Sequence, residues 1–145
     1  MDINLAKLTA SAFLEANRLC MNSHAEIGST GKHMLIPAVV CAAFAAEVGM
    51  KAAIATQGRN QKGHNLCKLF QGLSTPSQAR VIQLMDMNCE GFELKLQSCW
   101  ESFSIWRYIY EDDKGGSVSL SFLSLFALAI EKLNVESQNA AYPVG

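Results

Sequence analysis

The sequence predicts an all-α protein, an up-and-down bundle of five to six helices. Half of its 145 residues are hydrophobic and only 17% are charged, which is typical of a globular chain with a real core. Apolar residues recur at helical spacing through most of the chain, and polar stretches that contain glycine separate these segments. We therefore expect one domain over residues 1–134 and a loose tail over residues 135–145.

Apolar spacing and one proline predict the first three helices. Residues 3–22 carry apolar side chains at intervals of three and four, which places them on one helical face. Pro37 begins a second helix, because proline is tolerated in a first turn, and the alanine-rich pattern continues to about Gln57. A glycine-bounded loop follows, and a short third helix is expected over His64–Leu73.

Capping residues and aromatic content predict the other three. Thr75 at the N-cap and Pro76 at the first helical position begin a fourth helix. A fifth is expected over Phe92–Tyr110, where apolar and aromatic residues form a wide face. The last segment, Val118–Leu133, alternates serine with apolar residues at first, but its length favours a helix over a strand.

Charge limits the classes of ligand. The formal net charge of −1 argues against a protein that coats nucleic acid through bulk electrostatics. A local basic patch stays open, because four cations lie close together in the sequence: Lys51, Arg59, Lys62 and Lys68. The alternative, which we favour, is a solvated loop with charged neighbours.

Cysteine usage and hydropathy suggest a cytoplasmic protein. The five cysteines are odd in number, scattered and without a C-x-x-C pair, as in a reduced protein whose thiols act as small core residues. We expect no signal peptide. Glu47 and Lys51 interrupt the apolar stretch at 35–55, and the stretch at 118–130 is shorter than the roughly 18 residues that span a bilayer. No membrane association is therefore expected.

Glu47 and Lys51 are charged residues in the most apolar predicted helix. They stand four residues apart, in the favourable acid-first order, but an exposed pair of this kind contributes only about 0.3–0.5 kcal/mol. We expect Glu47 to be buried and to face a further partner. Arg107 is the natural one, since its aromatic-rich segment should line the same core, and Glu111 could extend the network. Alternatively, Arg107 binds phosphate.

His64 is the strongest candidate for chemistry. It opens the predicted third helix, where free backbone N–H groups favour anions, and Arg59 completes an Arg-x-x-x-x-His spacing. The favoured alternative is that His64 caps the helix and bonds a buried carboxylate or tyrosine. His64 and Cys67 could share a metal, but no second pair completes a tetrahedral set, so no metal is predicted. Phosphate-loop, dinucleotide and hydrolase motifs are absent, and no cofactor is predicted.

Three motifs in order resemble the HEPN superfamily. They are Ala46–Lys51 (AEVGMK), Gly63–Phe70 (GHNLCKLF) and Trp106–Glu111 (WRYIYE). The pattern is similar to that of bacterial HEPN-like proteins with "GHDL" and "WRYxYE" signatures, and it covers about residues 35–111. The resemblance implies an up-and-down helical bundle that packs as a homodimer.

The resemblance also implies two kinds of function. Many HEPN proteins are metal-independent ribonucleases of toxin–antitoxin and phage-defence systems, in which an arginine neutralises phosphate and a histidine moves protons. Others are non-catalytic, bind nucleotide or RNA, or pair with a small nucleotidyltransferase or another protein. No histidine follows Arg107, so catalysis here would fall on His64 with Arg59 or Arg107. The motif residues expected in a buried polar network are Glu47, Lys51, His64, Arg107, Tyr108, Tyr110 and Glu111.

We therefore carry two hypotheses. The preferred one is a non-catalytic HEPN-like module that binds nucleotide, RNA or a partner protein. The alternative is a ribonuclease. Burial of His64 against Glu47 or Tyr110 would favour the first, and a solvent-facing histidine beside an arginine would favour the second.

Overall fold

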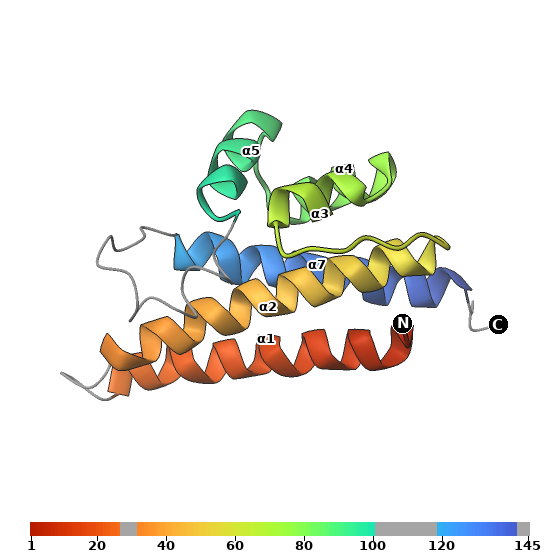
Figure 1. Ribbon diagram of the computed structural model, residues 1–145. Coiled ribbons are helices and arrows are strands. Elements are labelled where there is room, and N and C mark those ends of the chain that lie inside the picture. The colour runs from red at the N-terminus through yellow and green to blue at the C-terminus, as the bar shows by residue number, and fades with distance from the viewer. Residues whose placement is uncertain (27–31, 101–118, 142–145) are drawn as a thin grey trace.

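Three long helices and three short ones make up the part of the chain that the structure describes. This computed structural model describes residues 1–26, 32–100 and 119–141. The helices are α1 (Ile3–Glu26), α2 (Lys32–Thr56), α3 (Leu66–Gly72), α4 (Thr75–Leu84), α5 (Cys89–Ser98) and α7 (Leu120–Ala141) (Figure 1). No described residue is in a strand, so the all-α class is confirmed for these ranges.

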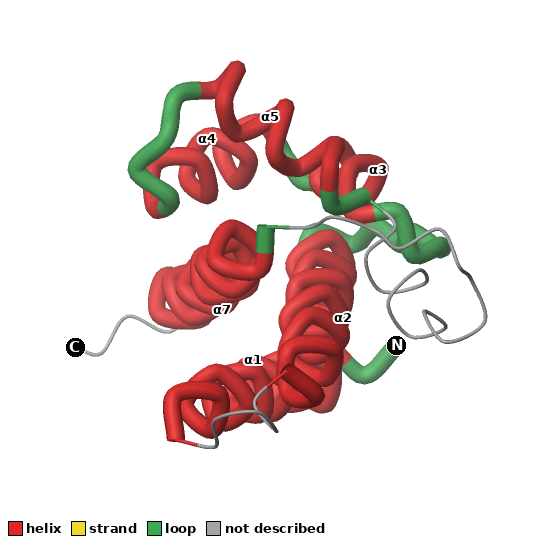
Figure 2. Tube along the Cα trace, turned by 90° about the vertical axis from the view of Figure 1, so that its left-hand side faces the viewer, coloured by secondary structure: helices red, strands yellow, loops and turns green. Residues whose placement is uncertain are grey.

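The long helices α1, α2 and α7 form a bundle, and the short helices cover one side of it. Figure 2 views the bundle nearly end-on, with α3, α4 and α5 in a layer above α2 and α7. In this layer α3 packs on α2, and α4 packs on α7. The layer therefore closes the core on the side away from α1.

The direction of α7 departs from a strict up-and-down order. Asn17 lies beside Ala38 and Ala10 lies beside Gly49, so α1 and α2 are antiparallel. By contrast, α7 runs in the same direction as α2 (Figure 1). The three short helices lie between α2 and α7 in the sequence, so these two parallel helices are not joined by a direct turn.

Helix α2 is the centre of the core. Most of its alanines are buried, and the small side chains let α1 and α7 approach its backbone. Its segment Met34–Thr56, with a mean hydropathy of 1.7, could cross a membrane by length and composition alone, yet 67% of the tested stretch is buried inside the protein. A helix at the centre of a folded protein has the same apolar composition, because protein surrounds it instead of lipid.

A phenylalanine cluster joins the short-helix layer to α7. The ring of Phe92 lies 4.8 Å from Phe70 and 5.7 Å from each of Phe122 and Phe126, measured between centroids. Phe92 and Phe126 are fully buried. Aromatic pairs at such distances stabilise a core beyond their buried area, so this cluster fixes the layer on the bundle.

Two buried asparagines tie the long helices together. Asn17 Nδ2 donates to the carbonyl of Ala38 at 2.9 Å, and Asn134 Nδ2 donates to the carbonyl of Gly49 at 3.0 Å. A Cβ atom on Gly49 would lie only 2.7 Å from Cγ2 of Ile130, so the absence of a side chain permits this close contact of α2 with α7. Neither asparagine stands out in the sequence.

The boundaries of the first two helices differ from the prediction. Helix α1 continues to Glu26, beyond the predicted end at residue 22. Helix α2 begins at Lys32, and Pro37 lies inside it rather than in its first turn. Proline lacks the N–H that would bond one turn back, so the helix forgoes a single hydrogen bond there.

The N-caps of α3 and α4 each lie one residue away from the predicted N-cap. Asn65, not His64, caps α3 and accepts a hydrogen bond from the Lys68 N–H at 3.0 Å. Ser74, not Thr75, caps α4, which leaves Thr75 and Pro76 in the first turn. Neighbouring residues of the same capping class are hard to rank without backbone angles.

The last two helices also end elsewhere. Helix α5 ends at Ser98, with Cys99 as its C-cap, whereas the predicted helix continued to Tyr110. Residues 101–110 of that prediction lie outside the described residues. Helix α7 continues past the predicted end at Leu133 to Ala141, so the segment expected to be a loose tail is helical up to that point.

Candidate functional site

A buried carboxylate with two nitrogen-bearing partners, a lysine and a histidine, is the centre of the candidate site. The side chain of Glu47 is 2% exposed. Its Oε1 atom accepts from Lys51 Nζ at 2.7 Å and lies 2.9 Å from Nδ1 of His64. No described residue bonds the other carboxylate oxygen, Oε2. Burying an acid is costly unless it is paired, and these two partners supply the pairing.

Helix geometry and one loop bring the three side chains together. Glu47 and Lys51 are one turn apart on α2, so they share a face. After α2, Gly58 adopts a φ of +71°, which suits the turn that ends a helix. Gly63 then adopts a φ of +102° immediately before His64, a conformation that other residues rarely take. The loop thus returns the chain to the side of Glu47.

Two glutamines hold this loop. Gln61 Nε2 donates to the carbonyl of Lys68 at 2.7 Å, and Gln57 Nε2 donates to Ser74 Oγ at 3.2 Å. The start of α3 is held as well, because the Leu66 N–H donates to the carbonyl of Trp100 at 3.0 Å. Neither glutamine could be recognised from the sequence, since a polar side chain in a polar loop carries no pattern of its own.

Arg59 and His64, which were proposed as a pair, bond to different residues in the structure. His64 is tied to Glu47, while the guanidinium of Arg59 donates to Gln57 Oε1 at 2.5 Å. The imidazole is nevertheless 60% exposed, so it is anchored at the core and open to solvent. The other predicted network residues, Arg107, Tyr108, Tyr110 and Glu111, lie outside the described residues, and the Glu47–Arg107 pair stays a prediction.

Positive charge dominates the sequence around the site. No aspartate or glutamate occurs between Glu47 and Asp86. Arg59, Lys62 and Lys68 are exposed, and none of them forms an ion pair with a described carboxylate. The loop and the short helix α3 therefore present cations whose charge is not cancelled by described neighbours.

The described residues do not assemble a metal centre. No three His, Cys, Asp or Glu side chains gather within the described ranges. Burial raises the pKa of the Cys67 thiol, and the nearby Cys99 adds to this effect. A thiol that resists ionisation is a poor metal ligand, which weakens the His64–Cys67 option.

The chemistry of the site is that of an anchored imidazole on a loop that also carries exposed cations. A carboxylate at Nδ1 orients the ring, as in many acid–base sites, and exposed lysine and arginine side chains bind phosphate. Comparison with protein-family models, curated proteins and solved structures gave no match to this chain. The function must therefore be argued from this geometry.

Proposed function

We propose that this chain is a non-catalytic, HEPN-like helical module that binds a phosphate-bearing ligand, a nucleotide or RNA, at the loop between α2 and α3. The single observation behind the proposal is the acid-free stretch from residue 48 to 85, which carries exposed cations on both sides of His64 in the sequence. The imidazole of His64 is itself anchored on buried Glu47. A cytoplasmic role in a defence or toxin–antitoxin system is the setting that the HEPN resemblance suggests.

The role of Glu47 in this proposal is structural. It engages Lys51 and His64 through one oxygen, so both side chains are held at the edge of the core. The exposed residues Arg59, Lys62 and Lys68 would supply the main contacts to phosphate. Because the whole chain has a net charge of −1, we expect modest affinity that depends strongly on salt.

The test is binding of a fluorescently labelled single-stranded RNA, with ATP as competitor, measured by anisotropy at two salt concentrations. Replacing Arg59, Lys62 and Lys68 together by glutamine should weaken binding about tenfold or more. Each lost phosphate contact should reduce the salt slope by about 0.7. Arg18→Gln is the matched control, because it removes an exposed cation from α1 on the opposite side of the bundle. Equal binding by the triple variant and the parent would refute the proposal.

A ribonuclease is the second candidate, and the 60% solvent exposure of the His64 side chain is the observation that favours it. A buried carboxylate that fixes the tautomer of an exposed imidazole is an arrangement used in general acid–base catalysis. The partner would be Arg59 or Arg107. Cleavage of RNA in EDTA that is lost in His64→Ala and Arg59→Ala, at unchanged melting temperature, would establish this activity. Binding without cleavage would leave the module non-catalytic.

A further inference from the structure

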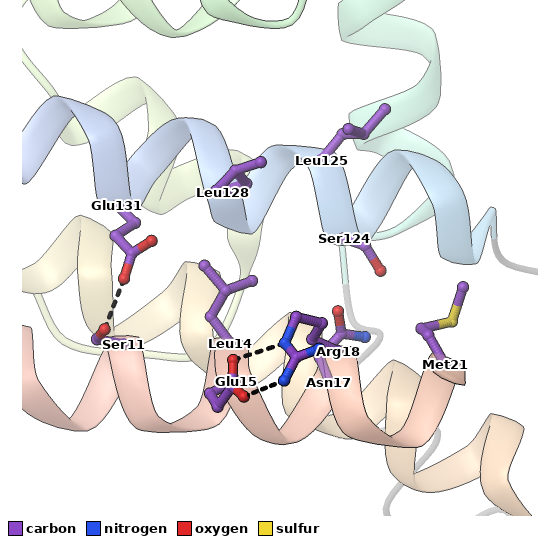
Figure 3. A pocket seen from close by; sticks show the side chains of 10 residues that line it. All are labelled: Ser11, Leu14, Glu15, Asn17, Arg18, Met21, Ser124, Leu125, Leu128 and Glu131. Carbon is purple, nitrogen blue, oxygen red and sulfur yellow. Dashed lines mark hydrogen bonds and ion pairs between the residues drawn. The ribbon is translucent and has the colours of Figure 1, made fainter. Parts of the chain in front are cut away.

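Two cavities of the described chain differ in how far their polar side chains are already bonded. The cavity between α1 and α7 has a volume of about 400 Å³ (Figure 3). Within it, Glu15 pairs with Arg18. Ser11 donates a hydrogen bond to Glu131 across the same cavity. A smaller cavity, of about 170 Å³, is lined by α3, α4 and α5, and most of its polar side chains are unbonded to described residues, so it is the better candidate for a ligand site.

Two short helices build the smaller cavity from matching positions. Each contributes three side chains at the spacing i, i+3 and i+4, which places them on one helical face. The two sets are Cys67, Phe70 and Gln71 on α3 and Glu93, Leu96 and Gln97 on α5. Phe70 and Leu96 are buried, so they form an apolar floor beneath the exposed polar side chains.

The polar side chains around this floor are available to a ligand. Gln71, Glu93 and Gln97 are exposed, and none of their side chains bonds a described residue. Gln78 on α4 also lines the cavity, and its Nε2 atom donates to the carbonyl of Leu73 at 2.9 Å. That bond fixes the amide and leaves its Oε1 atom as an acceptor. The cavity therefore combines a carboxylate with several amides over an apolar floor.

The size and the place of the cavity suit one base of a nucleotide. Pockets for drug-sized ligands have volumes of about 300–1,000 Å³, so a cavity of 170 Å³ holds a smaller group, such as one flat ring system. Unstacked RNA bases are held by aromatic side chains at the ring face and by hydrogen bonds at the ring edge. Lys68 is exposed and lies three residues from Gln71, so the two are neighbours on α3. A base in the cavity would have its phosphate beside Lys68.

Glu93 can distinguish between the bases. An ionised carboxylate only accepts hydrogen bonds, and its two oxygens match two donors that lie side by side. Guanine has such a pair on its Watson–Crick edge, the N1–H and the 2-amino group. Adenine, cytosine and uracil each place an acceptor beside the donor on that edge, so they can give a carboxylate one hydrogen bond only. The amide groups of Gln71 and Gln97 can donate to O6 and N7 of the same guanine.

We infer that this cavity, the base pocket, binds the guanine of an RNA or of a free guanosine nucleotide, and that Glu93 determines the specificity. Binding of this kind rests on the proposed function, because Lys68 would hold the phosphate of the same nucleotide. Glu93 forms no ion pair with Lys68 or any other described cation, so its carboxylate is not already engaged. A neutral base between them keeps the carboxylate away from the phosphate.

The test uses single-stranded RNA hexamers that differ at one central base in an otherwise all-uridine sequence, with binding measured by anisotropy. Guanine should bind about fivefold or more tightly than adenine, cytosine or uracil. Inosine, which lacks the 2-amino group, should lose most of this gain. Glu93→Gln should abolish the preference for guanine over inosine, because an amide presents one acceptor in place of two, and it should not weaken binding of the all-uridine RNA.

Glu90→Gln is the matched control. It removes the same charge from the first turn of the same helix, and Glu90 is exposed and does not line the base pocket. The control should keep the full preference for guanine. A Glu93→Gln variant that keeps it as well would overturn the assignment of Glu93.

The results also separate the base pocket from the proposed function. If all the RNAs bind the parent equally and the triple cation variant binds them weakly, the phosphate site stands and the guanine pocket is refuted. If the parent binds no RNA, the proposed function fails, and titration of isotope-labelled protein with GMP and AMP by NMR decides the matter. Amide shifts at Gln71, Glu93 and Gln97 with GMP alone would support the pocket. Equal shifts with both nucleotides, or shifts with neither, would overturn it.

Discussion

Removal of the Lys51 charge should destabilise the protein measurably. Lys51→Met keeps an apolar stem of similar length and deletes the ammonium group that bonds Glu47 at 2.7 Å. Breaking a buried ion pair by removing one partner costs about 3–5 kcal/mol in free energy of unfolding. Here the Lys51 side chain is 19% exposed and His64 remains at 2.9 Å, so the charge of Glu47 is not left alone. We therefore expect a loss of about 2 kcal/mol, below that range.

A double-mutant cycle isolates the pair. Glu47→Gln should cost about 1 kcal/mol, because the amide keeps the shape and the freed ammonium of Lys51 can reach water. The double variant should be more stable than the sum of the two losses predicts, with a coupling of about 1–2 kcal/mol. For a chain of this size, Lys51→Met should lower the melting temperature by about 4–8 °C.

The assay is equilibrium unfolding in urea followed by circular dichroism, with thermal melts alongside. Lys62→Met is the control, since Lys62 is exposed and forms no ion pair with a described residue, and its midpoint should equal that of the parent. A coupling of zero within error would show that Glu47 and Lys51 do not interact in solution. The account of the site as a paired, buried carboxylate would then fail.

Two further predictions concern packing and thiol reactivity. Gly49→Ala should lower the free energy of unfolding by about 1–2 kcal/mol in urea titrations, because the new methyl group meets Ile130 and overpacking outweighs the gain in helix propensity; an unchanged or higher midpoint would refute the close contact. Alkylation followed by mass spectrometry at neutral pH should modify exposed Cys89 first, since burial raises the pKa values of Cys41 and Cys67 and keeps them protonated. Their rates should rise as the pH increases through the raised pKa values, and equal rates for all three at neutral pH would contradict the burial.

Local patterns in the sequence predicted much of the helical structure. The alanine-rich segment around Glu47 indicates a central helix, and the corresponding helix α2 is buried along most of its length. The length of the last apolar segment likewise indicated a helix, although its first residues alternate as in a strand. Its end was missed because the residues after Leu133 are mostly polar, although α7 continues to Ala141. A solvated final helical segment has no apolar face to reveal it.

Long-range features could not be predicted in this way. The hydrogen bond from Asn134 to Gly49 depends on two helices that are distant in sequence, and a single buried asparagine looks like any polar residue in the chain. The parallel course of α2 and α7 depends on the layer of short helices between them, which no local pattern describes. At the candidate site, a charged pair at helical spacing was visible, but the return of His64 to Glu47 required a left-handed turn at Gly63.

The parallel course of α2 and α7 has a consequence for biosynthesis. The ribosome completes α2 long before residues 120–141, so the side of α2 that α7 covers stays exposed while the intervening helices are made. That side belongs to a segment with a mean hydropathy of 1.7, and it is covered only after α7, which is distant in the sequence, has been made. The nascent chain therefore carries an apolar helical face without its covering helix until residues 120–141 have been made.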